Sequence, residues 1–159
     1  MRTLAPLAVT LLFAIVSPSP ALALPIGFTL ETAVSAAPGG AAPRFTGATS
    51  CWLDGDLEAE ARLGFGSAHR PGGRGADGVT PGLGLRWTPD LGRWRPLLGV
   101  EAGVRLPVAG LTSAPTASVR AGIEILVRRQ LALSLAAGWR WSSGATPGAE
   151  GVLGLSYAP

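Results

Sequence analysis

The stretch Leu131–Ser142, LALSLAAGWRWS, alternates between two kinds of residue. Its odd positions are all apolar and end in Trp139 and Trp141, whereas its even positions are small or polar and include the charged Arg140. Successive side chains of a β-strand point to opposite faces, so a period of two predicts a strand whose faces meet two different environments. We therefore expect an all-β fold.

Other segments repeat this alternation on both sides of that stretch. An eighth strand is needed around Phe45–Leu53, where the pattern leaves open whether Cys51 or Trp52 faces outward. Short connections alternate with longer segments rich in Gly and Pro, which predicts an antiparallel up-and-down barrel of about eight strands with both termini at one end. The six clear segments are residues 26–35, 57–65, 79–87, 95–106, 117–127 and 152–157, and the predicted longer loops are residues 36–44, 67–78, 107–116 and 143–149.

The N-terminus has the features of an export signal. Arg2 precedes the apolar run Leu4–Val16, and Ala21-Leu22-Ala23 places small residues where a signal peptidase cleaves. The run is too short to cross a bilayer as a helix. We predict a signal peptide at residues 1–23 and one mature domain at residues 24–159; the alternative is a buried N-terminal element.

The composition excludes several classes of protein. All 13 basic residues are arginine, and there are 10 acidic residues. This small positive excess does not indicate a nucleic-acid-binding surface. The single cysteine, Cys51, forms neither an internal disulfide nor a metal cluster, so we expect no metal and no cofactor. No later apolar run reaches the length of a transmembrane helix, so a mature chain in a membrane would have to be a barrel.

Aromatic residues on the apolar faces gather near the predicted strand ends. A soluble β-sandwich or lipocalin-like barrel would also alternate, but with its apolar face inward. Aromatic girdles at both rims, together with charges and glycines crowded on the polar face, favour a barrel whose apolar face meets lipid. The predicted girdle is Phe28, Phe65, Trp87, Trp94, Trp139, Trp141 and Tyr157.

In pattern and layout the mature chain resembles the small eight-stranded outer-membrane barrels, such as the OmpA transmembrane domain, OmpX and OmpW. The segment Val152–Tyr157 is similar to the C-terminal recognition strand of that class, although Ala158-Pro159 follow its aromatic residue. The resemblance implies a location in the bacterial outer membrane. It also implies contact with outer-membrane lipid and lipopolysaccharide, and with the barrel assembly machinery during biogenesis. We expect a monomer.

The polar faces carry a nearly balanced set of charges. An eight-stranded barrel is just wide enough for side chains, and buried charges must pair, so these residues are predicted to form a lumenal network. A static polar plug is the favoured interpretation and an ion pathway the alternative; Glu60 with Arg86 and Glu101 with Arg120 are the pairs we expect. The predicted network is Glu31, Glu58, Glu60, Arg62, Arg86, Arg95, Glu101, Arg105, Arg120, Glu124 and Arg140.

These features predict a non-enzymatic outer-membrane barrel with a structural, surface-interaction or envelope-integrity role. A narrow solute channel and a lipid A-modifying enzyme are the alternatives. The enzyme would use His69, the only histidine, as a general base near Ser67, but no acid is placed to orient it, so a solvated loop residue is the plainer interpretation. Arg44, Arg70 and Arg74 are expected in outward loops, where they would either meet lipopolysaccharide phosphates or, as the favoured interpretation, remain solvated charges, because three scattered charges do not form a patch.

Overall fold

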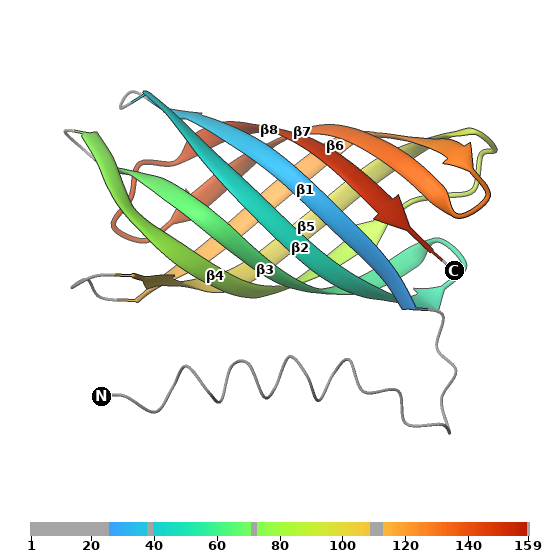
Figure 1. Cartoon of the computed structure of the whole chain (residues 1–159), viewed down its shortest axis with the longest axis horizontal. Coiled ribbons are helices and arrows are strands. Elements are labelled where there is room, and N and C mark those ends of the chain that lie inside the picture. Colours follow the sequence, from blue (N-terminus) through green and yellow to red (C-terminus); the bar gives the residue numbers. More distant parts are fainter. Residues whose placement is uncertain (1–25, 38–39, 71–72, 109–112, 159) are drawn as a thin grey trace, which may run out of the picture.

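Eight antiparallel strands close into one barrel in the computed structural model (Figure 1). The structure describes residues 26–37, 40–70, 73–108 and 113–158, and the predicted signal peptide lies outside them. No helix among these residues is long and apolar enough to cross a membrane. The predicted fold class is confirmed. The strands are β1 Ile26–Ala37, β2 Gly40–Asp54, β3 Leu57–Arg70, β4 Gly73–Trp87, β5 Trp94–Pro107, β6 Ala114–Arg128, β7 Leu131–Ser142 and β8 Gly148–Tyr157.

Each strand pairs with its neighbour in sequence, and β8 pairs back with β1. Strand β1 begins and β8 ends at the same end of the barrel, which we call the terminal rim (Figure 1). The opposite end, the distal rim, carries the β1–β2, β3–β4, β5–β6 and β7–β8 hairpins. This arrangement places both ends of the described chain on one side of the barrel.

Two of the four longer loops expected at the distal rim, residues 36–44 and 67–78, were wrong, whereas longer connections do join β5 to β6 and β7 to β8. Strand pairing continues to Ala37 opposite Gly40, and to Arg70 opposite Gly73. Gly and Pro in these segments indicated loops, but ladder hydrogen bonds join backbone groups and continue wherever both strands stay in register. The hairpins therefore extend the barrel wall by several residues beyond the predicted strands.

Strand β2 covers the segment with the poorest pattern, and its register settles which side chains face inward. Residues directly opposite one another on paired strands share a face. Trp52 lies opposite Glu58, which is buried, whereas Cys51 lies opposite Ala59. Trp52 is therefore on the inward face of the barrel and Cys51 on the outward face.

The barrel exposes apolar side chains on its outer face and buries polar side chains inside, the reverse of a soluble protein. On the outer face Leu30 is 68% exposed and Leu83 is 69% exposed, whereas Arg62 inside is 1% exposed. The apolar cluster found among the described buried residues is small: Ala33, Leu97, Ala136 and Val152. A lipocalin-like barrel would place its apolar face inward. The distribution of side chains excludes that alternative.

Candidate functional site

The polar faces of all eight strands converge on the interior of the barrel. Among the side chains that the structure describes, six carboxylates and six guanidinium groups lie there, and we call this set the lumenal network. Ten of its members were predicted to face inward, while Arg44 and Glu150 were not. The network comprises Glu31, Glu58, Glu60, Glu101, Glu124, Glu150, Arg44, Arg62, Arg86, Arg105, Arg120 and Arg140.

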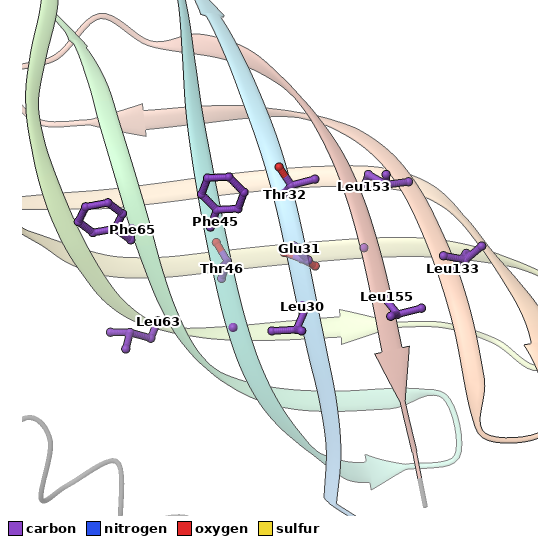
Figure 2. A pocket seen from close by; sticks show the side chains of 12 residues that line it. Leu30, Glu31, Thr32, Phe45, Thr46, Leu63, Phe65, Leu133, Leu153 and Leu155 are labelled. Carbon is purple, nitrogen blue, oxygen red and sulfur yellow. The ribbon is translucent and has the colours of Figure 1, made fainter.

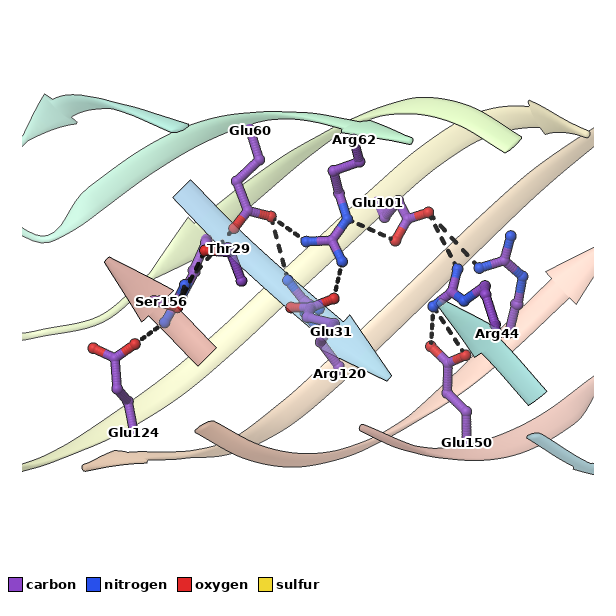
Figure 3. Close-up of polar contacts among 12 residues, drawn as sticks. Thr29, Glu31, Arg44, Glu60, Arg62, Glu101, Arg120, Glu124, Glu150 and Ser156 are labelled. Atoms are coloured by element: carbon purple, nitrogen blue, oxygen red, sulfur yellow. Dashed lines mark hydrogen bonds and ion pairs between the residues drawn. The ribbon is translucent and has the colours of Figure 1, made fainter. Parts of the chain in front are cut away.

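Four of these charges form a closed ring, which we call the central quartet: Glu31, Glu60, Arg62 and Arg120 (Figure 3). Each carboxylate contacts both guanidinium groups. Arg62 pairs with Glu31 and lies 2.5 Å from Glu60, measured from Nη1 to Oε2. Arg120 reaches Glu31 at 2.6 Å and Glu60 at 3.2 Å. Every charge in the ring is therefore neutralised by two partners.

The central quartet crosses the lumen. Glu31 lies on β1, Glu60 and Arg62 on β3, and Arg120 on β6, and neither β1 nor β3 is hydrogen-bonded to β6 in the closed order of strands. All four side chains are 1–6% exposed. Pairing of this kind offsets the several kcal/mol that burying an isolated ion costs. The ring therefore links opposite sides of the barrel interior through polar side chains.

Toward the terminal rim, Arg86 continues the network. It pairs with Glu124 of β6, lies 3.8 Å from Glu60 and hydrogen-bonds to the Ser156 hydroxyl at 3.2 Å. The structure thus brings Glu60 and Arg86 within ion-pair distance, as we expected from the sequence. The long Glu60–Arg86 contact is secondary to the Arg86–Glu124 pair. Arg86 therefore links the two sides of the lumen on this side of the quartet.

Toward the distal rim, Arg44 and Glu101 carry the network onward (Figure 3). The Arg44 guanidinium lies 3.2 Å from Glu150 and 3.5 Å from Glu101. Glu101 also contacts Arg62 at 3.2 Å and Arg140 at 3.7 Å. The expected pairing of Glu101 with Arg120 was wrong, because Arg120 is occupied by the quartet.

Arg44 was predicted to lie in an outward loop, and that placement was also wrong. The residue lies in β2 opposite Ala33, and it is 8% exposed. The alternation in the sequence could have placed both Arg44 and Glu150 inside the barrel. Arg44 shares the parity of Thr46, and Glu150 shares the parity of Val152 and Gly154. Arg44 was missed because residues 36–44 were taken to be a loop, in which parity has no meaning, and Glu150 because it precedes the predicted strand segment 152–157.

Arg95, a predicted member of the network, does not join it. Its guanidinium pairs with the exposed Asp90 at 3.0 Å, beside the turn between β4 and β5 at the terminal rim. His69 and Arg74 are strand residues paired across β3 and β4, not loop residues. The side chains of His69, Arg70 and Arg74 lie outside the described part of the structure. Within the described part, no group of acidic, His or Cys residues could hold a metal ion.

Inward glycines make space for the arginines. A Cβ atom on Gly99 would lie 2.7 Å from Nε of Arg120, which is directly opposite on β6. A Cβ on Gly84 would lie 3.3 Å from both Arg62 and Glu60. The lack of side chains at these two positions therefore sets how the quartet packs against the wall.

The described outer face of the barrel carries exposed leucine, valine and aromatic side chains. A shallow depression runs over Gly47 of β2, which lies between Leu30 of β1 and Leu63 of β3, and the leucines of β7 and β8 border it (Figure 2). The residues predicted for the girdle are all 40–58% exposed, and Phe45, opposite Phe65 on the same face, is exposed as well. Leu30, Leu63 and Leu155 therefore give this part of the described outer face an apolar surface.

Three solved structures share this architecture. Neisserial surface protein A aligns with a TM-score of 0.58 at 12% identity, over 83% of this chain and 94% of its own. The N-terminal β-barrel domain of Pseudomonas aeruginosa OprF gives 0.53 at 14% identity, over 84% and 97%. A de novo designed transmembrane β-barrel gives 0.51 at 18% identity, over 84% and 95%. The chain has the fold of the small outer-membrane barrels.

The resemblance expected from the sequence is thereby confirmed at the level of the fold. No protein-family model matches the sequence, and no curated protein does.

Proposed function

We propose that this chain is an integral outer-membrane protein of a Gram-negative bacterium, with a structural, surface-interaction or envelope-integrity role and no catalytic activity. One observation carries the proposal: the apolar side chains face outward around the whole barrel, while the charges are paired inside. Only a hydrocarbon environment makes that distribution favourable, because water would leave a broad apolar surface exposed.

The ion pairs that cross the lumen support a structural role more than a channel. The central quartet joins β1, β3 and β6 across the interior, and the pairs on either side of it fill the barrel toward both rims. An eight-stranded barrel leaves little room beyond its own side chains. The described interior therefore behaves as a polar core that stabilises the wall.

The proposal includes export and assembly. Cleavage after residue 23 would release a chain that begins close to Ile26, the first residue of β1. The outward side chains of β8, Leu153, Leu155 and Tyr157, form an apolar face that suits recognition by the barrel assembly machinery. Lipid and lipopolysaccharide are the partners that fit the outer surface.

Cell fractionation with electrophoresis before and after boiling tests this proposal. We expect the protein in the outer-membrane fraction, with an N-terminus near Leu24 by mass spectrometry. The unboiled protein should migrate differently from the boiled one, because a closed barrel resists detergent at room temperature. A freely soluble periplasmic protein without a mobility shift would contradict the proposal.

A further inference from the structure

A register shift in β6 turns an arginine toward the outer face at the terminal rim. Before the shift, the even-numbered residues of β6 face inward, as the buried Glu124 does. Pairing with β7 then shifts between Leu126 and Arg128, so that Arg128 lies opposite Leu131. Leu131 lies in turn opposite Tyr157 of β8, a residue of the aromatic girdle. Residues directly opposite one another share a face, so Arg128 faces outward at the level of the girdle.

Backbone hydrogen bonds fix this part of the rim on both sides. The amide of Leu126 donates to the carbonyl oxygen of Arg93, which directly precedes β5, at 3.0 Å. The amide of Ala158, after β8, donates to the carbonyl oxygen of Gln130 in the β6–β7 turn, also at 3.0 Å. Arg128 follows Leu126 by two residues, which is about 7 Å along a strand. The side chains of Arg93 and Arg128 can therefore reach a common point.

Three arginines of this part of the rim have no carboxylate partner among the described residues. Arg93, Arg128 and Arg129 are all exposed, and none of them pairs with a described acidic residue. We call these three residues the arginine patch. The β2–β3 turn carries acidic residues but lies on the opposite side of the closed barrel, and Asp90 of the β4–β5 turn pairs with Arg95. The arginine patch therefore carries uncompensated positive charge.

The position of the arginine patch is that of lipid headgroups in a membrane. Exposed aromatic residues mark the headgroup level, and here Trp94 follows Arg93 while Tyr157 shares the row of Arg128. An outward arginine is tolerated at this level because its guanidinium group extends into the headgroups. Among headgroup components, a phosphate suits a guanidinium group best, because it accepts two parallel hydrogen bonds. The short turns of outer-membrane barrels face the periplasm, where the leaflet consists of glycerophospholipids.

We propose that the arginine patch binds the phosphodiester headgroup of an anionic glycerophospholipid. The proposal rests on the membrane location proposed above and adds a lipid partner at a defined place on the barrel. Phosphatidylglycerol should bind better than zwitterionic phosphatidylcholine, because the patch offers no carboxylate that would hold the ammonium group. Each arginine near a membrane surface favours an anionic lipid by a factor of about five.

Solution NMR of the folded barrel in micelles of an uncharged detergent locates the bound headgroup. Dihexanoylphosphatidylglycerol should shift the amide signals of residues 93–94 and 127–130 until they saturate. Dihexanoylphosphatidylcholine, with the same chains, should bind about tenfold more weakly or less. Inorganic phosphate is the probe for a free anion and should require a much higher concentration than phosphatidylglycerol. The same shifts at equal concentrations of inorganic phosphate would overturn the proposal of a lipid site.

Two single variants that lose the same charge provide the comparison. Arg128→Gln should raise the Kd of dihexanoylphosphatidylglycerol about fivefold. Arg70→Gln removes a positive charge from the distal end of β3 and should leave that Kd unchanged. Equal Kd values for the two variants, or no saturable shift in the unmodified protein, would contradict the arginine patch. Cell fractionation tests the membrane location separately, so an outer-membrane protein without this lipid preference would overturn the present proposal alone.

Discussion

Arginine at the centre of this barrel contacts several carboxylates at once, which a lysine side chain could not do in the same way. The guanidinium of Arg62 contacts Glu31, Glu60 and Glu101 through three different nitrogen atoms. A planar fork with five donors makes such simultaneous contacts, whereas an ammonium group acts as a single point charge. The absence of lysine from the whole sequence agrees with an interior that depends on this fork.

A double-mutant cycle on Glu31 and Arg120 tests the central quartet. Each single change, Glu31→Gln or Arg120→Gln, should cost about 3–5 kcal/mol of unfolding free energy, because it leaves partners buried without compensation. The double variant should lose less than the sum of the two, with a coupling of about 1–3 kcal/mol. Urea unfolding in lipid vesicles measures all three variants.

Arg44 and Glu124 supply the control cycle, because they lie toward opposite rims and pair with different residues in the described structure (Figure 3). Their losses should add within about 0.5 kcal/mol. Additive losses for Glu31 with Arg120 as well would show that the two do not interact.

The sequence predicted which charges lie inside the barrel better than it predicted their partners. Parity alone places Glu101 and Arg120 on the inward face, because it depends only on the strand period. Their actual partners depend on strand register and on how far each side chain reaches across the lumen. Arg120 contacts Glu31, which is 89 positions away in the sequence, and no local pattern contains that contact.

At the scale of the strands, the loss of stability caused by a charged substitution depends on whether the residue faces outward and on its depth in the bilayer. Leu135 lies near the middle of β7 and is 59% exposed, whereas Leu53 is 58% exposed close to the turn that follows β2. Leu135→Arg should destabilise the barrel in lipid by about 2–4 kcal/mol, and Leu53→Arg by about 0–1 kcal/mol. Equal costs for the two variants would contradict the predicted position of the bilayer.

Strand identity was predictable where apolar and polar residues alternate cleanly, as in β7. Strand ends were not predictable near the distal rim. Ala, Gly and Pro around residues 36–44 give no contrast between the faces, yet the β1–β2 ladder runs through them. Backbone pairing there is set by the neighbouring register, which composition does not reveal.

For the whole molecule, the polar plug that we propose predicts that the barrel does not conduct ions. The unmodified barrel in a planar bilayer should give no steady conductance. The variant Glu31→Ala/Glu60→Ala/Arg62→Ala/Arg120→Ala removes the quartet and should let ions pass, provided that its heat-dependent mobility shift shows it has folded. Arg95→Ala, at the terminal rim, should stay silent. Steady current through the unmodified barrel would favour the channel alternative.

The contact between Glu31 and Arg120 also governs the order of events in assembly. Strands β1 and β6 meet through these side chains only after the sheet has curled far enough to bring them face to face, so early hairpins gain nothing from them. Contacts that join distant parts of a chain make folding slow, because the loop must close before the contact stabilises it. Dismantling the barrel must break the same contacts at the outset. The barrel should therefore form late and cooperatively and, once formed, open at a rate far below that of its local fluctuations.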